Sequence, residues 1–147
     1  MGVQSEEAVP FSLMLLLDSE AISAFAHGPR QRRDKVRALI GLMRTRGLSV
    51  ATVAAVLSEV VRGRPADASV FAGLRRERVE VHNVDTRVGV RAGRLLGAIG
   101  AGSELAIDAF VVAVADLAGG AIVATTDPED LKRLAAHATR VRVADIS

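Results

Sequence analysis

The chain has 147 residues, half of them hydrophobic, which is enough for one domain with a single substantial core and argues against disorder. Aromatic residues make up only 3%, so few rings are available for stacking on nucleic-acid bases. The formal net charge of +2 permits a phosphate-backbone partner without requiring one. Because there is no cysteine, disulfides and thiolate metal sites are excluded.

The amino-terminal segment predicts neither a targeting signal nor a membrane span. Residues 1–10 are expected to form a polar tail, followed by a single domain over residues 11–147. Glu6 and Glu7 stand where a signal peptide would carry basic residues, and the leucine run that follows is too short for a signal peptide or a bilayer. We therefore expect a cytoplasmic protein that makes no membrane contact.

The apolar run at residues 13–17 ends at Asp18, which Ser19 follows. A short apolar run without alternation is typical of a strand buried on both faces, as in the parallel sheets of α/β proteins. Ligands of such sheets bind beyond the carboxyl ends of the strands, so Asp18 lies where chemistry is first expected. Ser19 predicts the N-cap of a helix over residues 20–26.

Strands and helices alternate along the rest of the chain, which predicts a three-layer α/β/α sandwich with a central, mostly parallel sheet. Further strands are expected at residues 48–51, 78–84, 121–124 and 140–143. Helices are expected at residues 31–46, 53–62, 66–76, 86–99, 104–118 and 129–137, with Thr52, Asp85 and Ser103 as N-caps and Pro128 in the first helical position. Gly89, Gly93 and Gly97 recur every fourth residue and predict a face for close helix packing.

Asp108 is the most informative of the candidate acids. It lies in a predicted helix that is apolar nearly all round, where aspartate is a poor helix former and a buried unpaired charge is costly. A cation partner, either an arginine or a metal ion, would offset both costs. Alternatively, Asp108 faces solvent through a narrow polar stripe that it shares with Glu104.

The other three candidate acids each have a structural explanation. A glutamate such as Glu59, at the edge of the apolar stripe of its helix, is usually just solvated. Asp127, which precedes Pro128, suits a helix N-cap. Asp18 could simply end its strand near the first turn of a helix, although Ser19 already offers a cap there.

Taken together, the four acids predict a divalent-metal site. Asp18 and Asp127 each end a predicted strand, so they share the carboxyl edge of one parallel sheet, and Glu59 and Asp108 lie on helices that can pack around that edge. Carboxylates gathered in one pocket raise one another's pKa unless a cation compensates. Oxygen ligands without His or Cys indicate Mg²⁺ or Mn²⁺ rather than zinc.

These residues and their surroundings resemble the PIN-domain family, and within it the VapC-type ribonuclease toxins of toxin–antitoxin pairs. The resemblance is carried by four segments: LMLLLD ending at Asp18, VLSEVVRG around Glu59, AIDAFVVAVA around Asp108 and ATTDPEDLKRL around Asp127. They occur in the family's order and cover nearly the whole chain from about Phe11 onward.

The resemblance implies a Mg²⁺- or Mn²⁺-dependent endoribonuclease that cleaves single-stranded RNA with a metal-activated water, acting as the toxin of a type II toxin–antitoxin system. It also implies a homodimer and a cognate antitoxin that occludes the acidic site. The residues that it assigns are Asp18, Glu59, Asp108 and Asp127 as metal-binding and catalytic acids, Asp130 as an accessory acid, and Thr126 and Ser19 as hydroxyls that orient carboxylates or a bound water.

Other functions are weighed against this one. A catalytically silent PIN-like binding module is the main alternative, although such modules tend to lose acids and all four are present. A phosphoacceptor signalling domain would need a lysine at the end of a late strand, whereas Lys35 and Lys132 are predicted on helices. A haloacid-dehalogenase-like phosphatase would need a second aspartate two residues after Asp18, where Glu20 stands.

The arginines of residues 30–46 and the three histidines remain open to interpretation. The arginines could guide an RNA backbone towards the acids, or they could form the solvated face of an amphipathic helix, which is the preferred explanation. His27, His82 and His137 are widely spaced and match no metal-binding pattern, so they are expected to be structural or exposed.

Overall fold

A five-stranded parallel sheet forms the centre of the fold. The computed structural model describes residues 13–147, so the tail expected at residues 1–10 lies outside the described part. The strand order is β3-β2-β1-β4-β5, and all four pairings are parallel, as the α/β class predicted. The strands are β1 (Met14–Leu17), β2 (Ser49–Val53), β3 (Glu80–His82), β4 (Ala121–Thr125) and β5 (Val141–Asp145).

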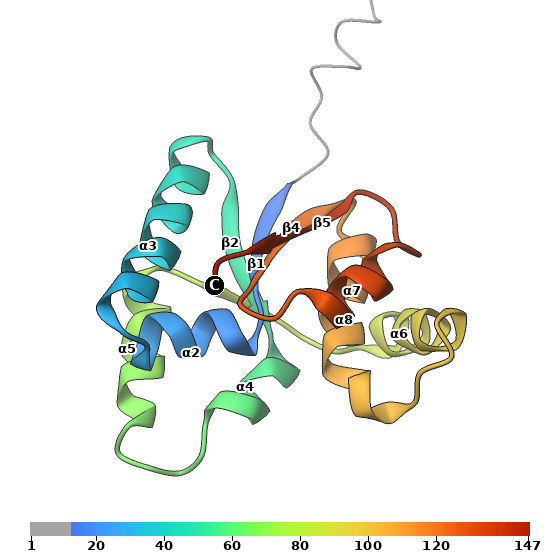
Figure 1. Cartoon of the computed structure of the whole chain (residues 1–147), viewed down its shortest axis with the longest axis horizontal. Coiled ribbons are helices and arrows are strands. Elements are labelled where there is room, and N and C mark those ends of the chain that lie inside the picture. The colour runs from blue at the N-terminus through green and yellow to red at the C-terminus, as the bar shows by residue number, and fades with distance from the viewer. Residues whose placement is uncertain (1–12) are drawn as a thin grey trace, which may run out of the picture.

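Helices cover both faces of this sheet, which confirms the three-layer sandwich. They are α2 (Ser19–His27), α3 (Arg30–Thr45), α4 (Ala54–Val60), α5 (Asp67–Arg76), α6 (Thr86–Ala98), α7 (Ala106–Leu117) and α8 (Glu129–Ala135), with the 3₁₀ turn η1 (Ser103–Leu105) before α7. Helices α2, α3 and α5 lie on one side, and α6, α7 and α8 lie on the other (Figure 1). Helix α4 contacts both α2 and α7, so it lies where the two layers meet beyond the end of β2. Among the helices of residues 13–147, none is both long and apolar enough to cross a bilayer.

Strand β1 is the centre of the core. All four of its residues are buried, and Leu15, Leu16 and Leu17 are fully inaccessible. β1 pairs with β2 on one side and with β4 on the other, while helices pack on both of its faces. The unalternating leucine run therefore has the two-sided burial that was predicted from it.

Several helix starts differ from the expected N-caps. The side chain of Asp18, not Ser19, caps α2, because Asp18 Oδ1 accepts a hydrogen bond of 2.8 Å from the backbone N–H of Ala21. Thr52 is buried inside β2 and donates to the Leu17 carbonyl at 2.7 Å instead of capping α4. Ser103 lies in η1, and no side chain caps α7. The prediction for Asp85 is confirmed, since its carboxylate accepts from the Val88 N–H at 3.0 Å.

The glycine face of α6 has no packing partner within residues 13–147. A Cβ placed on Gly89, Gly93 or Gly97 would meet no atom within 4 Å. The expected close packing is therefore wrong for the single described chain. The face that α6 does bury carries Val88, Ala92 and Leu95, which belong to the core and leave the glycines on the opposite side.

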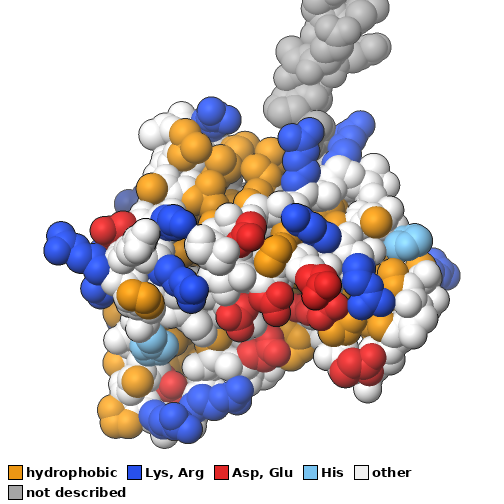
Figure 2. Space-filling view, in the orientation of Figure 1, with side chains coloured by type: hydrophobic (Ala, Val, Ile, Leu, Met, Phe, Trp, Pro, Cys, Tyr) orange, Lys and Arg blue, Asp and Glu red, His pale blue; other side chains and the backbone are white. Residues whose placement is uncertain are grey.

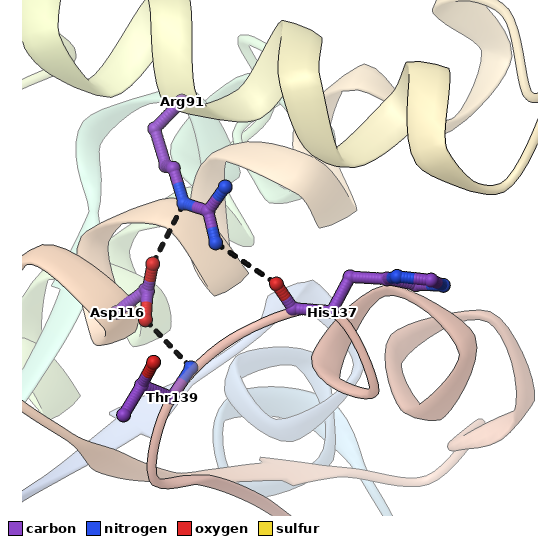
Figure 3. Close-up of polar contacts among 4 residues, drawn as sticks. All are labelled: Arg91, Asp116, His137 and Thr139. Atoms are coloured by element: carbon purple, nitrogen blue, oxygen red, sulfur yellow. Dashed lines mark hydrogen bonds and ion pairs between the residues drawn. The ribbon is translucent and has the colours of Figure 1, made fainter.

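An ion pair ties α6 to α7 and to the loop before β5 (Figure 3). Arg91 Nε donates to Asp116 Oδ2 at 2.7 Å, and Arg91 Nη2 donates to the His137 carbonyl at 2.9 Å. The second oxygen of Asp116 accepts from the Thr139 N–H at 2.7 Å. The Asp116 side chain is only 12% exposed, so this network joins three segments in a place where water screens it weakly.

We predict that Asp116→Ala lowers the free energy of unfolding by about 2–3 kcal/mol, because it removes two charge-assisted hydrogen bonds and leaves Arg91 half-buried without its anion. Urea denaturation followed by circular dichroism measures this. Asp34→Ala is the matched control, because Asp34 is 63% exposed and pairs with Arg30 at 3.9 Å on the surface of α3. The control should cost less than about 0.5 kcal/mol. Equal losses in the two variants would refute the role of the network.

Candidate active site

Asp18 lies at the carboxyl end of β1 and is held by its own backbone. The N–H of Asp18 donates to the Ala124 carbonyl at 3.3 Å, which extends the pairing of β1 with β4 by one residue. The Asp18 carboxylate accepts from the Ala21 N–H at the start of α2 and from the hydroxyl of Thr125 at the end of β4. Asp18 is 4% exposed and Thr125 is fully buried, so the position of this carboxylate is fixed from two sides.

Burial raises the pKa of Asp18 to about 7. The hydrogen bonds from Thr125 and Ala21 work in the opposite direction and lower it, while the nearby charges of Asp108 and Glu20 raise it further. Desolvation outweighs the two hydrogen bonds because transfer of a carboxylate out of water costs more than two neutral donors return. Near neutral pH the Asp18 carboxyl is therefore close to half protonated, and its charged form is unfavourable.

Asp108 lies in the first turn of α7 and is half-buried next to other acids. Its pKa is raised to about 6, first by burial and then by neighbouring carboxylates, which are Glu59, Asp130, Asp127 and Glu20 in decreasing order of effect. The alternative in which Asp108 shares a solvent-facing stripe with Glu104 is not what the structure has. Glu104 instead turns back within η1, where its carboxylate accepts from the Gly102 N–H at 2.9 Å.

Glu59 on α4 and Asp127 after β4 complete the acid set from exposed positions. The expectation that Asp127 caps α8 is wrong, because Pro128 occupies the N-cap position and no side chain caps the helix. The N–H of Asp127 donates to Thr125 Oγ1 at 3.0 Å, so the same hydroxyl group bonds both to Asp18 and to the backbone of Asp127. The Asp127 carboxylate itself is left free to turn.

No Lys, Arg or His side chain within residues 13–147 forms an ion pair with Asp18, Glu59, Asp108 or Asp127. The arginine partner considered for Asp108 is thus absent from this part of the chain. Figure 2 shows acidic side chains gathered on one face between α2 and α8, with Lys and Arg side chains on both sides of them. The repulsion within the acid set is therefore left to solvent or to a bound cation.

Of the three accessory residues, Asp130 and Thr126 interact with acids of the site and Ser19 does not. Asp130 pairs with Arg133 at 3.1 Å, although its charge still acts on Asp108. Thr126 donates to Glu20 Oε1 at 3.1 Å, so it orients an acid that the sequence interpretation had not included. The hydroxyl of Ser19 makes no hydrogen bond with the described residues. These contacts therefore give no support to the expected role of Ser19 in orienting a carboxylate or a bound water.

Sequence reasoning missed two residues of the site, Thr125 and Glu20. Thr125 bonds to Asp18, and the charge of Glu20 acts on both Asp18 and Asp108. A signal existed for each of them. Thr125 stands at the predicted strand end beside Thr126, and Glu20 lies two residues after Asp18.

The donor chemistry of the site fits a hard divalent cation, because every candidate ligand is a carboxylate or hydroxyl oxygen. As they are placed, however, no three His, Asp or Glu side chains of residues 13–147 converge into a coordination cluster. Asp18 is fixed, whereas Glu59 and Asp127 are exposed. Joint coordination of one ion would thus require the exposed side chains to rotate inwards.

Comparison with known proteins places this arrangement in a family. The model of the PIN domain family matches residues 15–137, a range that includes all four acids. The chain belongs to the PIN domain family. No match was found among curated proteins.

Two solved structures share the fold of this PIN domain. The structure of DNA-bound VapBC from Salmonella typhimurium has a TM-score of 0.60 and 18% identity, and the match covers 89% of this chain and 98% of that chain. The structure of VapBC2 from Rickettsia felis, bound to a DNA fragment from its promoter, has a TM-score of 0.65 and 16% identity, covering 90% and 100% of the two chains. At these identities the likeness is one of fold.

We predict that Asp18→Asn stabilises the metal-free PIN domain at pH 8. The folded Asp18 carboxyl keeps its proton up to about pH 7, whereas the unfolded carboxyl loses it near 3.8, so its contribution to stability falls as the pH rises between these values. Asparagine keeps the capping oxygen and removes the charge. In urea denaturation with EDTA, the gain should be on the order of 2 kcal/mol at pH 8 and should disappear near pH 4.

Asp85→Asn is the matched control, because Asp85 also caps a helix but is exposed. It should change the free energy of unfolding by less than about 0.5 kcal/mol at either pH. An Asp18→Asn variant that is less stable than the unmodified chain at pH 8 would contradict the burial of an uncompensated charge.

Proposed function

We propose that this PIN domain is a Mg²⁺- or Mn²⁺-dependent endoribonuclease and the toxin component of a type II toxin–antitoxin pair. The observation that carries the proposal is the uncompensated acid set at the carboxyl edge of the sheet, in which burial and mutual repulsion raise the pKa of Asp18 and of Asp108. A divalent cation offsets that repulsion, which explains why such a costly set would be retained.

In the proposed mechanism, the metal is held by Asp18, Glu59, Asp108 and Asp127. An ion held there would supply activation of a water and stabilisation of the charge that develops on the phosphate. Asp18 provides the fixed ligand, since the Ala21 N–H and the Thr125 hydroxyl hold its orientation. Glu59 and Asp127 would contribute their carboxylates from exposed positions, and the Thr125 hydroxyl accepts a hydrogen bond from the backbone N–H of Asp127.

Single-stranded RNA is the proposed substrate. Lys and Arg side chains flank the acids on the same face (Figure 2), which gives a polyanion an attractive approach on both sides of a repulsive centre. This distribution also requires that the acids be neutralised before a phosphate can reach them. Metal binding and substrate binding are thus coupled in the proposal.

A cognate antitoxin is the proposed protein partner. The two similar folds come from structures described as VapBC, which supports a protein partner for this chain as well. The antitoxin would cover the acidic site and so control access of RNA to it.

The decisive experiment incubates the purified chain with labelled single-stranded RNA in Mg²⁺ or Mn²⁺. Cleavage is expected with either ion, and it should be abolished by EDTA. Asp18→Asn and Asp108→Asn should each reduce the rate at least ~100-fold, because each removes a proposed metal ligand. Product formation is followed on denaturing gels, with folding checked by circular dichroism.

Glu129→Gln is the charge-matched control, because Glu129 is an exposed acid at the start of α8, two residues from Asp127. It should leave the rate within about twofold, as expected for a surface substitution. A folded protein, free of antitoxin, that cuts no RNA with either ion would reject the nuclease in favour of a silent PIN-like binding module.

We also propose that the chain is a homodimer. The uncovered glycine face of α6, next to the exposed Val90, supports a second copy as a packing partner. Multi-angle light scattering should then give twice the chain mass of 15.4 kDa. Gly93→Glu adds a side chain where a single chain has open space, so it should yield a folded monomer. A monomeric mass for the unmodified chain would reject the dimer.

A further inference from the structure

A pocket of about 250 Å³ lies beside the acid set, and two of its lining residues are Glu20, whose charge acts on Asp18 and Asp108, and Thr126, which precedes Asp127. Its walls come from the outer part of α2, the start of α3 and the residue after β4, and they include Glu20, Ser23, His27, Arg32 and Thr126. Glu20 joins the pocket to the site, since its charge acts on both Asp18 and Asp108. Pockets for drug-sized ligands measure about 300–1,000 Å³, so this smaller one suits one unit of a longer chain.

The walls of the pocket carry three different kinds of chemistry. Arg32 is exposed and has no ion-pair partner among residues 13–147, in contrast to Arg30, which pairs with Asp34. His27 contributes the one ring that lines the pocket. Glu20 offers a carboxylate that Thr126 holds through a hydrogen bond of 3.1 Å.

This mixture fits a nucleotide better than a simple anion. A free phosphate would meet the Glu20 carboxylate, which repels it, as well as the Arg32 guanidinium. A nucleotide carries both an anion and hydrogen-bond donors. Its phosphate can reach the Arg32 guanidinium while its ribose hydroxyl or base amino group donates to the Glu20 carboxylate. Unstacked RNA bases are commonly held on histidine or other rings, which is a contact that His27 can make.

We propose that this pocket binds the nucleotide next to the scissile phosphate of a single-stranded RNA, with Arg32 on its phosphate, His27 on its base and Glu20 accepting from its sugar or base. The proposal rests on the nuclease function proposed above. It gives Arg32, one of the arginines of the basic helix α3, a specific task. It also makes Glu20 the residue that links nucleotide binding to the metal-binding acids.

The experiment measures binding apart from cleavage, by fluorescence anisotropy of a short labelled single-stranded RNA with the Asp18→Asn protein in Mg²⁺. Added Arg32→Gln should weaken binding about tenfold and reduce the slope of log K against log salt by about 0.7, the loss of one phosphate contact. Arg37→Gln is the matched control, because Arg37 is also exposed on α3 but lines no part of the pocket. It should stay within about twofold of the parent protein.

His27 is tested in the same assay with two variants. His27→Ala should weaken binding about tenfold through loss of stacking, and His27→Phe should restore it. Equal effects of Arg32→Gln and Arg37→Gln, or equal effects of the two His27 variants, would overturn the proposed nucleotide site.

The nuclease proposal and the nucleotide-site proposal can fail separately. Metal-dependent cleavage without any effect of the pocket variants on binding would support the nuclease and reject the nucleotide site. Binding that depends on the pocket residues, without cleavage, would support the nucleotide site and reject the nuclease.

Discussion

Asp18 is buried at the end of the strand that lies in the middle of the sheet, and no cation among residues 13–147 neutralises its carboxylate. The pairing of β1 with β4 sets its position, and the start of α2 and the Thr125 hydroxyl hold its oxygens. One side chain thus begins a helix and also carries an unfavourable charge. The acid of the site thus lies at the end of the most buried strand, where desolvation strongly disfavours the ionised form of its carboxyl group.

The rest of the site is arranged around this carboxylate by elements that are far apart in the sequence. α4 brings Glu59, α7 brings Asp108 and the end of β4 brings Asp127, and the two helices contact each other beyond the sheet. Asp18 is fixed by its hydrogen bonds, whereas Glu59 and Asp127 are exposed and can adjust. For the proposed metal site, a rigid acid beside adjustable ones would suit an ion that enters after folding, because the carboxylates need not all lie at ligand distance beforehand.

The order of elements was predictable from the sequence, because apolar runs mark buried strands. Because the ends of parallel strands share one edge, the sequence also indicated that the candidate acids lie near one another, and in the structure Asp108 acts on Asp18 while Glu59 and Asp127 act on Asp108. The finer contacts were not predictable. Asp18 and Ser19 are equally good capping residues, and the choice between them depends on where β1 stops pairing with β4. Likewise, one further residue in β4 makes Thr125, and not Thr126, the hydroxyl that reaches Asp18. Such details depend on tertiary register, which local propensity does not encode.

The strand order has a consequence for synthesis of the chain on the ribosome. β1 lies between β2, which follows about a quarter of the chain later, and β4, whose first residue is Ala121. The β1–β4 half of the sheet, with Thr125 and Asp127, can therefore form only after most of the polypeptide has emerged, since long-range pairing has to wait for its partner. A nascent chain therefore carries Asp18 for most of its translation before Thr125, its hydrogen-bond partner, and Asp127 have been made.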